Sequence, residues 1–213
     1  MGVVQQLVDD VLSEGGFDTD STAVLRWLTR RHFKMVVRSR CYRKTVDIGP
    51  TVAAQQDYSI STDVVEIYQV TVGGIPYGKG RHVELAQGAR GFLLLDDPSG
   101  GLLAAEEATD GSPQIALYPI PGTSGVSVLM RAAWRPPDLS TSDDTTLKIP
   151  ADFYDALVAG AIATGMRRIE QRADLAAPFE SEYSDACEEL RRQVNRQYRG
   201  TGPAQIRVQG INA

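Results

Sequence analysis

The sequence has few of the residues that bind metals or form disulfides, with two cysteines and two histidines among 213 residues. Cys41 and Cys187 lie far apart and neither belongs to a C-x-x-C pair, while His32 and His82 fall on different expected elements. A disulfide-stabilised fold needs several paired cysteines, and a zinc site needs closely spaced ligands. We therefore expect no metal, no cofactor, and two reduced, buried thiols typical of a cytoplasm-like compartment.

Long apolar runs are also missing. No segment approaches the roughly 18 apolar residues that cross a bilayer, so we expect no contact with a membrane. Residues 1–16 have neither a basic start nor an apolar centre, and we do not expect a signal peptide there. The hydrophobic content of 42% and the charged content of 23% are ordinary for a folded soluble protein with a real core.

Motifs for catalysis are lacking too. Residues 73–79 read GGIPYGK and fit the G-x-x-x-x-G-K pattern of phosphate-binding loops, but Gly80 stands where Ser or Thr would hold magnesium. Residues 122–126, GTSGV, miss the spacing of the G-x-S-x-G nucleophile turn. We interpret residues 73–80 as a turn between strands and predict that the protein is not an enzyme.

Four segments show the apolar period of a helix, namely residues 3–13, 21–41, 150–169 and 174–199. Asp20 or Ser21 is expected to cap the second helix, Pro150 suits the first turn of the third, and Asp174 is a candidate cap for the fourth. Gly15–Gly16 is expected to end the first helix. The residues expected to face inward in the last two helices are Phe153, Leu157, Ala161, Met166, Ile169, Leu175, Phe179, Tyr183, Cys187, Leu190 and Val194.

The segment between the two helix pairs alternates apolar and polar residues and is rich in β-branched side chains, which predicts strands. Four expected strands lie in TVDIG (45–49), DYSIS (57–61), VVEIYQVTV (64–72) and GFLLLDD (91–97). Residues 114–118 and 126–134 are predicted to pair as a hairpin with one apolar face, because Pro119 and Pro121 end the first strand and Gly122–Gly125 supplies a turn. Residues 96–113 and 138–146 are expected to be a long excursion and a polar linker.

The order of these elements predicts an α+β fold. Two N-terminal and two C-terminal helices are expected to form a helical bundle with an inserted small antiparallel β-sandwich or barrel and an extended C-terminal tail. The predicted domains are the N-terminal helices (1–44), the β domain (45–149), the C-terminal helices (150–199) and the tail (200–213).

Charge is unevenly distributed along the chain. The net charge is −5, but residues 1–44 carry +3, residues 45–150 carry −7 and residues 151–213 carry −1. Four cations recur every four residues and therefore share one face of the second helix, while Arg31, Arg40, Arg43 and Lys44 add to the charge. These candidate partner-binding residues are Arg26, Arg30, Lys34 and Arg38.

Three interpretations of this basic face stay open. It is a solvated helix face, a surface for nucleic acid, or a contact for the acidic part of a neighbouring copy. The acidic middle of the chain argues against DNA binding over the whole surface. In the tail, Ile206 and Val208 fall on one side of an extended segment, with Ile211 further along, and we predict that this strap binds a partner by strand addition.

Several stretches together resemble the head–tail adaptor (connector) proteins of tailed bacteriophages and of phage-like gene-transfer particles. These stretches are STAVLRWLTRRHFKMV, QQDYSIS, VVEIYQV, IALYPIPG, VSVLMRAAWRPPDL, KIPADFYDALVAGAIATGMRR and FESEYSDACEELRR. Their order and spacing carry the resemblance over about residues 5–200. Many relatives have Asn where this chain has Thr29, and Pro where it has Ser61.

The resemblance implies a structural protein of the virion neck, present in the host cytoplasm before assembly. Such proteins form a ring, commonly of twelve copies, below the portal protein at the portal vertex. The ring extends the DNA channel, through which DNA passes without sequence-specific binding, and docks a stopper or tail protein. Two alternatives remain, a tail-terminator or stopper protein of the neck and a nucleic-acid-binding module that uses the basic face.

Overall fold

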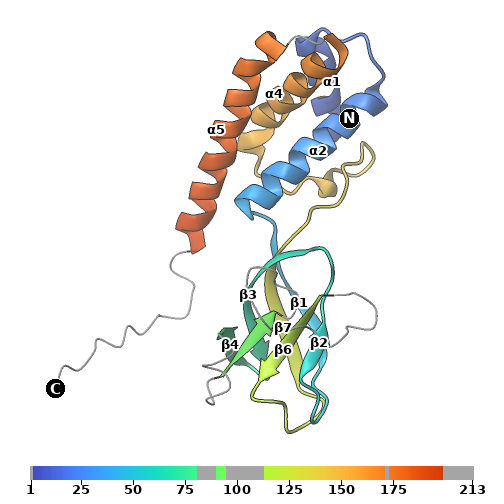
Figure 1. Ribbon diagram of the computed structural model, residues 1–213. Coiled ribbons are helices and arrows are strands. Elements are labelled where there is room, and N and C mark those ends of the chain that lie inside the picture. The colour runs from blue at the N-terminus through green and yellow to red at the C-terminus, as the bar shows by residue number, and fades with distance from the viewer. Residues whose placement is uncertain (1, 81–89, 95–112, 171–172, 199–213) are drawn as a thin grey trace, which may run out of the picture. The chain divides into compact units, whose positions relative to one another are not determined.

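The chain folds into two compact units. The computed structural model describes residues 2–80, 90–94, 113–170 and 173–198. The helical unit comprises residues 1–41 and 136–213, so it is built from both ends of the chain, and the sheet unit is the continuous segment 42–135 (Figure 1). The α+β class predicted from the sequence is confirmed.

The described part of the helical unit contains four α-helices. They are α1 (Val3–Gly15), α2 (Ser21–Ser39), α4 (Tyr154–Gly165) and α5 (Ala173–Tyr198). A short 3-10 turn, η2 (Ala151–Phe153), leads into α4, and a π-helical turn, η3 (Met166–Glu170), follows it. All four helices predicted from the apolar period are present, and no helix among the described residues is long and apolar enough to cross a membrane.

Helix α4 is the centre of the helical unit. It packs against α1, α2 and α5, and it is apolar on nearly every side, as expected of a helix that is covered all round. Two glycines allow the close approach, because a Cβ on Gly160 would lie 2.5 Å from the ring of Tyr183, and one on Gly165 would lie 2.5 Å from the ring of Phe17. The core of this unit therefore depends on small residues where α4 packs against α5 and against Phe17.

The helix ends follow the local sequence in two places and depart from it in a third. The Asp20 side chain accepts a hydrogen bond of 2.9 Å from the backbone N–H of Thr22, which confirms the predicted cap of α2. Gly16 ends α1 in the left-handed conformation with φ of 62°. Asp174 lies inside the first turn of α5, which begins at Ala173, so it is not the residue that precedes the helix.

The expected inward stripes of the last two helices are largely correct, with two exceptions. Ile169 is 46% exposed, because it lies in the wide turn η3, where the 3.6-residue period no longer applies. Leu175 is 37% exposed, whereas its neighbour Ala176 is fully buried. The buried stripe of α5 runs from Ala176 through Tyr183, and Leu175 lies outside it.

The segment 136–149 packs with the helices. Leu139 and Ile149 are buried in the helical unit, and the backbone N–H of Lys148 donates a 3.0 Å hydrogen bond to Nε2 of the buried His32. The unit boundary therefore falls between residues 135 and 136, earlier than the expected end of the β domain at residue 149.

The sheet unit is one curled seven-stranded sheet, a half-barrel, with strand order β1-β7-β3-β4-β5-β6-β2. The strands are β1 (Arg43–Pro50), β2 (Asp57–Ser59), β3 (Val64–Val72), β4 (Ile75–Lys79), β5 (Gly91–Leu94), β6 (Gln114–Tyr118) and β7 (Ser127–Trp134). Its core consists of Tyr58, Ile60, Ile67, Val70, Tyr77, Phe92, Ile115, Leu117, Val128, Met130, Ala132 and Trp134. The pair β4–β5 runs parallel, so the expectation of a purely antiparallel sheet is wrong at this pair.

The predicted hairpin of residues 114–118 and 126–134 does not form. Strand β6 pairs with β2 and β5, whereas β7 pairs with β1 and β3. The intervening residues bond elsewhere: Thr51 donates to the carbonyls of Thr123 and Val126, and it accepts from the N–H of Gly125. These long-range bonds separate β6 from β7, which the local sequence does not indicate.

Candidate partner-binding grooves of the helical unit

The four cations of the basic stripe share the outer face of α2. Arg26, Arg30, Lys34 and Arg38 are all exposed, while the opposite face of the helix buries its apolar residues. Arg31 is different, because only 8% of its side chain is accessible. Arg31 therefore adds no exposed charge to this face.

Arg31 lies in a polar network between α2, α4 and α5. Its guanidinium donates two hydrogen bonds of 2.8 and 2.7 Å to the two carboxylate oxygens of Glu180, and a third of 2.8 Å to the hydroxyl of Thr164. The Tyr183 hydroxyl donates a 2.6 Å bond to the carbonyl of Arg31, whose guanidinium also lies 4.9 Å from the Tyr183 ring centre. This network fixes the helices that carry the exposed cations.

The environment shifts the pKa of three groups in or next to this network, Glu180, Tyr183 and Cys187. Hydrogen bonds from Arg31 lower the pKa of the Glu180 carboxyl, and the charges of Arg31 and Arg167 act in the same direction. Burial raises the pKa of the Tyr183 phenol, and burial also raises the pKa of the Cys187 thiol. Glu180 is therefore ionised at neutral pH and neutralises Arg31, while Tyr183 is a neutral hydrogen-bond donor.

Beside this network lies a groove of about 560 Å³, here called the basic groove. Arg30, Phe33 and Lys34 of α2 line the groove together with Arg167 and Arg168 of η3, and Asp138 also lines it. Phe33 is 39% exposed, which is unusual for a large aromatic residue on a helix surface. Cations around an exposed ring suit the carboxylates or phosphates of a partner surface.

The sequence indicated only half of this groove. Arg30 and Lys34 belong to the predicted stripe, whereas Arg26 and Arg38 do not line the groove. Arg38 instead pairs with Glu188 of α5 at 2.6 Å. The η3 contribution was missed, although the adjacent arginines in MRRIE were a visible signal, because nothing in the local pattern predicts a π-helical turn.

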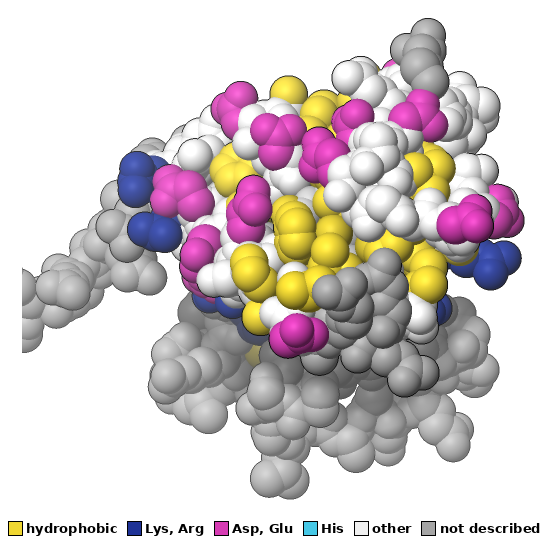
Figure 2. Space-filling view, turned by 90° about the horizontal axis from the view of Figure 1, so that it is seen from above, with side chains coloured by type: hydrophobic (Ala, Val, Ile, Leu, Met, Phe, Trp, Pro, Cys, Tyr) yellow, Lys and Arg dark blue, Asp and Glu magenta, His cyan; other side chains and the backbone are white. Residues whose placement is uncertain are grey.

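A second, smaller groove of about 110 Å³ carries the opposite charge and is here called the acidic groove. Its floor is apolar, formed by Val158, Ala159, Ile162 and Phe179, and its walls hold the carboxylates Asp10, Glu14, Asp155 and Glu182. Figure 2 shows Asp and Glu side chains gathered around hydrophobic ones on one face of the helical unit, with Lys and Arg at its margins. No group of acidic, histidine or cysteine residues suited to a metal ion occurs in the described part of the chain.

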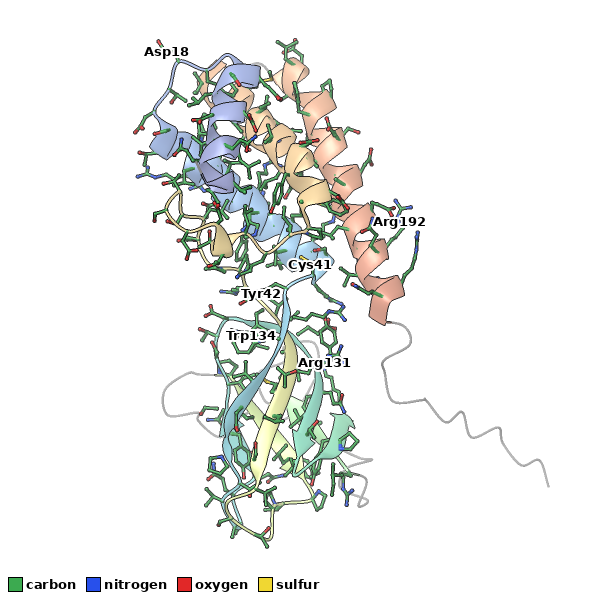
Figure 3. All side chains as sticks on the ribbon, turned by 180° about the vertical axis from the view of Figure 1, so that it is seen from behind. Asp18, Cys41, Tyr42, Arg131, Trp134 and Arg192 are labelled. Carbon is green, nitrogen blue, oxygen red and sulfur yellow. The ribbon has the colours of Figure 1, made fainter. Side chains whose placement is uncertain are left out.

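The remaining basic residues near the start of the sheet unit lie against aromatic rings. Arg43 lies 4.2 Å from the ring centre of Tyr68, and Lys44 lies 4.0 Å from that of Trp134. The backbone N–H of Trp134 donates a 2.9 Å bond to the carbonyl of Tyr42, and these two residues are labelled in Figure 3. Arg43 and Lys44 therefore stack inside their own unit.

Other sequence candidates have simple structural roles or lie outside the described residues. The GGIPYGK stretch forms a two-residue turn at Gly73 and Gly74, both with positive φ, so the interpretation as a turn is confirmed for these two residues. It is wrong for the rest of the stretch, because Ile75–Lys79 forms strand β4. Cys187 is buried and Cys41 only half-buried, and both are free thiols. The strap residues Ile206, Val208 and Ile211 lie beyond the described part of the chain.

Comparison with known proteins identifies the family. The family described as SU10 adaptor protein has a sequence model that matches residues 3–207, which is nearly the whole chain. The chain therefore belongs to this family, and the resemblance to phage head–tail adaptors is confirmed. No curated protein matches the chain.

Proposed function

We propose that this phage adaptor protein is a structural component of the virion neck. Copies form a ring below the portal, extend the DNA channel and dock the next neck or tail protein. The observation that carries the proposal is the family match over residues 3–207. In this proposal the four helices act as one bundle, which packs beside the bundle of the next copy.

The charge of the chain supports a passive channel. Each copy carries a net charge of −5, so a ring of many copies is strongly negative. Attraction between proteins and DNA is mainly an electrostatic attraction to phosphate. A negative channel therefore lets DNA pass without binding it, while the basic groove faces a protein.

The test is a binding assay against the two neighbours in the neck. Purified protein is incubated with tagged portal protein alone, with tagged stopper or tail protein alone, and with both. An adaptor is expected to bind the tagged portal protein directly. The stopper should be recovered with the portal only in mixtures that contain the adaptor. The chain would instead belong to the stopper or tail-terminator layer if it bound the stopper or tail protein but bound the portal only when a further protein was present.

A loss-of-function experiment tests the neck function itself. Particles that lack this protein are expected to be heads filled with DNA but without tails, since an adaptor acts after packaging and before tail attachment. Electron microscopy of the particles gives the answer. Normal tailed particles would contradict the proposal.

A nucleic-acid-binding module is the second candidate, favoured by Arg30, Lys34, Arg167 and Arg168 around one groove. Such binding is strongest at low salt and weakens steeply as salt is raised. A mobility-shift titration of duplex and single-stranded DNA, with Arg30→Glu/Lys34→Glu as the control variant, tests it. No shift at low salt removes this candidate.

A further inference from the structure

The two grooves lie on opposite sides of helix α4. Val158 and Ile162 line the acidic groove and are about 40° apart around the helix, at about 100° per residue. Thr164 lines the basic groove and lies about 200° beyond Ile162. One helical unit thus presents a basic surface and an acidic surface that point in different directions.

The two surfaces are matched in chemistry as well as in charge sign. The basic groove holds four exposed cations around Phe33, and the acidic groove holds four carboxylates around an apolar floor that includes the half-buried Phe179. Complementary charge around an apolar centre is the usual arrangement of a specific protein interface.

The charges needed for such a contact are not neutralised inside the helical unit. Arg31 and Arg38 pair with Glu180 and Glu188, and Arg167 lies 3.3 Å from Glu180. Within the described side chains, however, no ion pair involves Arg30, Lys34 or Arg168, or any of Asp10, Glu14, Asp155 and Glu182. Both surfaces therefore retain charge for a partner.

We propose that the basic groove of one copy binds the acidic groove of a second copy of this chain. The contact is heterologous, because each copy offers a different surface to each neighbour. A heterologous contact repeats head to tail and closes into a ring when its rotation allows. This inference rests on the proposed neck function and names the surfaces through which neighbouring copies meet. Two copies that met basic groove to basic groove would repel each other.

The test uses two variants with opposite defects. Arg30→Glu/Lys34→Glu leaves the four cation positions of the basic groove with no net charge, and Asp155→Lys/Glu182→Lys does the same for the four carboxylate positions of the acidic groove. We expect each variant alone to self-associate at least about tenfold more weakly than the wild type, because several charge pairs become repulsive. An equimolar mixture should restore association, since the unchanged acidic groove of the first variant then meets the unchanged basic groove of the second.

The measurement is native mass spectrometry and light scattering at low and moderate ionic strength, with circular dichroism to show that each variant is folded. Arg26→Glu is the matched control on the same stripe outside the basic groove, and Asp185→Lys is the control on α5 outside the acidic groove. Both controls should associate like the wild type, and added salt should weaken the wild-type contact.

Two results would overturn the proposal: a wild type that stays monomeric at low ionic strength and high concentration, or a mixture that associates no better than its two components. Neither result bears on whether the protein binds the portal. The portal-binding assay therefore separates failure of this contact from failure of the neck function.

Discussion

Arg31 and Glu180 form a two-bond ion pair that joins α2 to α5, with donor–acceptor distances of 2.8 and 2.7 Å. They are separated by 149 residues in the chain, and the entire sheet unit lies between them in sequence. The pair therefore connects the N-terminal and C-terminal parts of the helical unit. Its loss should show how much the two ends depend on each other.

Replacing Glu180 by Gln should destabilise the helical unit. Arg31 would keep its charge in a site where 8% of its side chain is accessible, and a buried charge without its partner is costly. Glu180 is 33% exposed, so water screens part of the unpaired charge. We therefore expect the free energy of unfolding, measured in urea, to decrease by about 1–3 kcal/mol.

The exposed pair Arg38–Glu188 offers a matched control for that measurement. Glu188→Gln should cost less than about 1 kcal/mol, because both partners are well exposed to solvent. Equal losses for the two variants would contradict the role assigned to the buried pair.

Acidification should destabilise the protein in the range where His32 titrates. Burial lowers the pKa of His32 from 6.5 to about 4, and the charge of Lys148 acts in the same direction. The unfolded chain therefore binds a proton on this imidazole between pH 6.5 and 4 while the folded chain does not, so stability falls as pH falls. The difference between the two pKa values corresponds to a full loss of about 3 kcal/mol in the free energy of unfolding.

Urea unfolding between pH 7.5 and 4.5 measures this loss. His32→Gln keeps a hydrogen-bond acceptor for the backbone N–H of Lys148 but cannot titrate, so its stability should depend less on pH. A His32→Gln variant with an unchanged pH profile would show that another group is responsible.

The first turn of α1 should loosen when Asp144 is replaced by Ala. The Asp144 carboxylate accepts bonds of 2.8 and 3.0 Å from the backbone N–H groups of Val3 and Val4, and these bonds lower the pKa of the carboxyl. Without them, two N–H groups at the helix start lose their acceptor. Hydrogen exchange by mass spectrometry should then be faster in α1 and unchanged in α5.

Gly160→Ala should destabilise the packing of α4 against α5. The added Cβ would lie 2.5 Å from Cδ2 of Tyr183, and this ring is fixed by its hydrogen bond to the Arg31 carbonyl. Overpacking of this kind costs about 1–3 kcal/mol. Gly122→Ala is the control, because nothing lies within 4 Å of its added Cβ, and its midpoint of thermal unfolding should stay close to that of the wild type.

Truncation after Gly200 tests the predicted strap. Strand addition through Ile206, Val208 and Ile211 predicts weaker binding to the neighbouring neck protein, with no change in the circular dichroism of the folded units. A pull-down with the truncated and full-length chains measures it. Equal recovery of the partner by both chains would rule out strand addition by the tail.

Local patterns predicted most of the elements because their causes are local. The cap at Asp20, the left-handed Gly16 and the apolar spacing of the helices act within a few residues. The strands from residue 43 to residue 72 follow from alternation and β-branched residues in the same way. Four helices and an α+β fold could therefore be predicted before any tertiary contact was known.

Neighbouring residues alone thus specify the helices, most strands and the exposed cations Arg30 and Lys34. Long-range contacts, in contrast, pair β6 and β7 with other strands, neutralise Arg31 with Glu180, and let Asp144 cap a helix about 140 residues away. It also brought Arg167 and Arg168 beside the α2 stripe. These features arise from groups that are distant in the chain, and their pairing is fixed by burial and hydrogen bonding that no local pattern encodes.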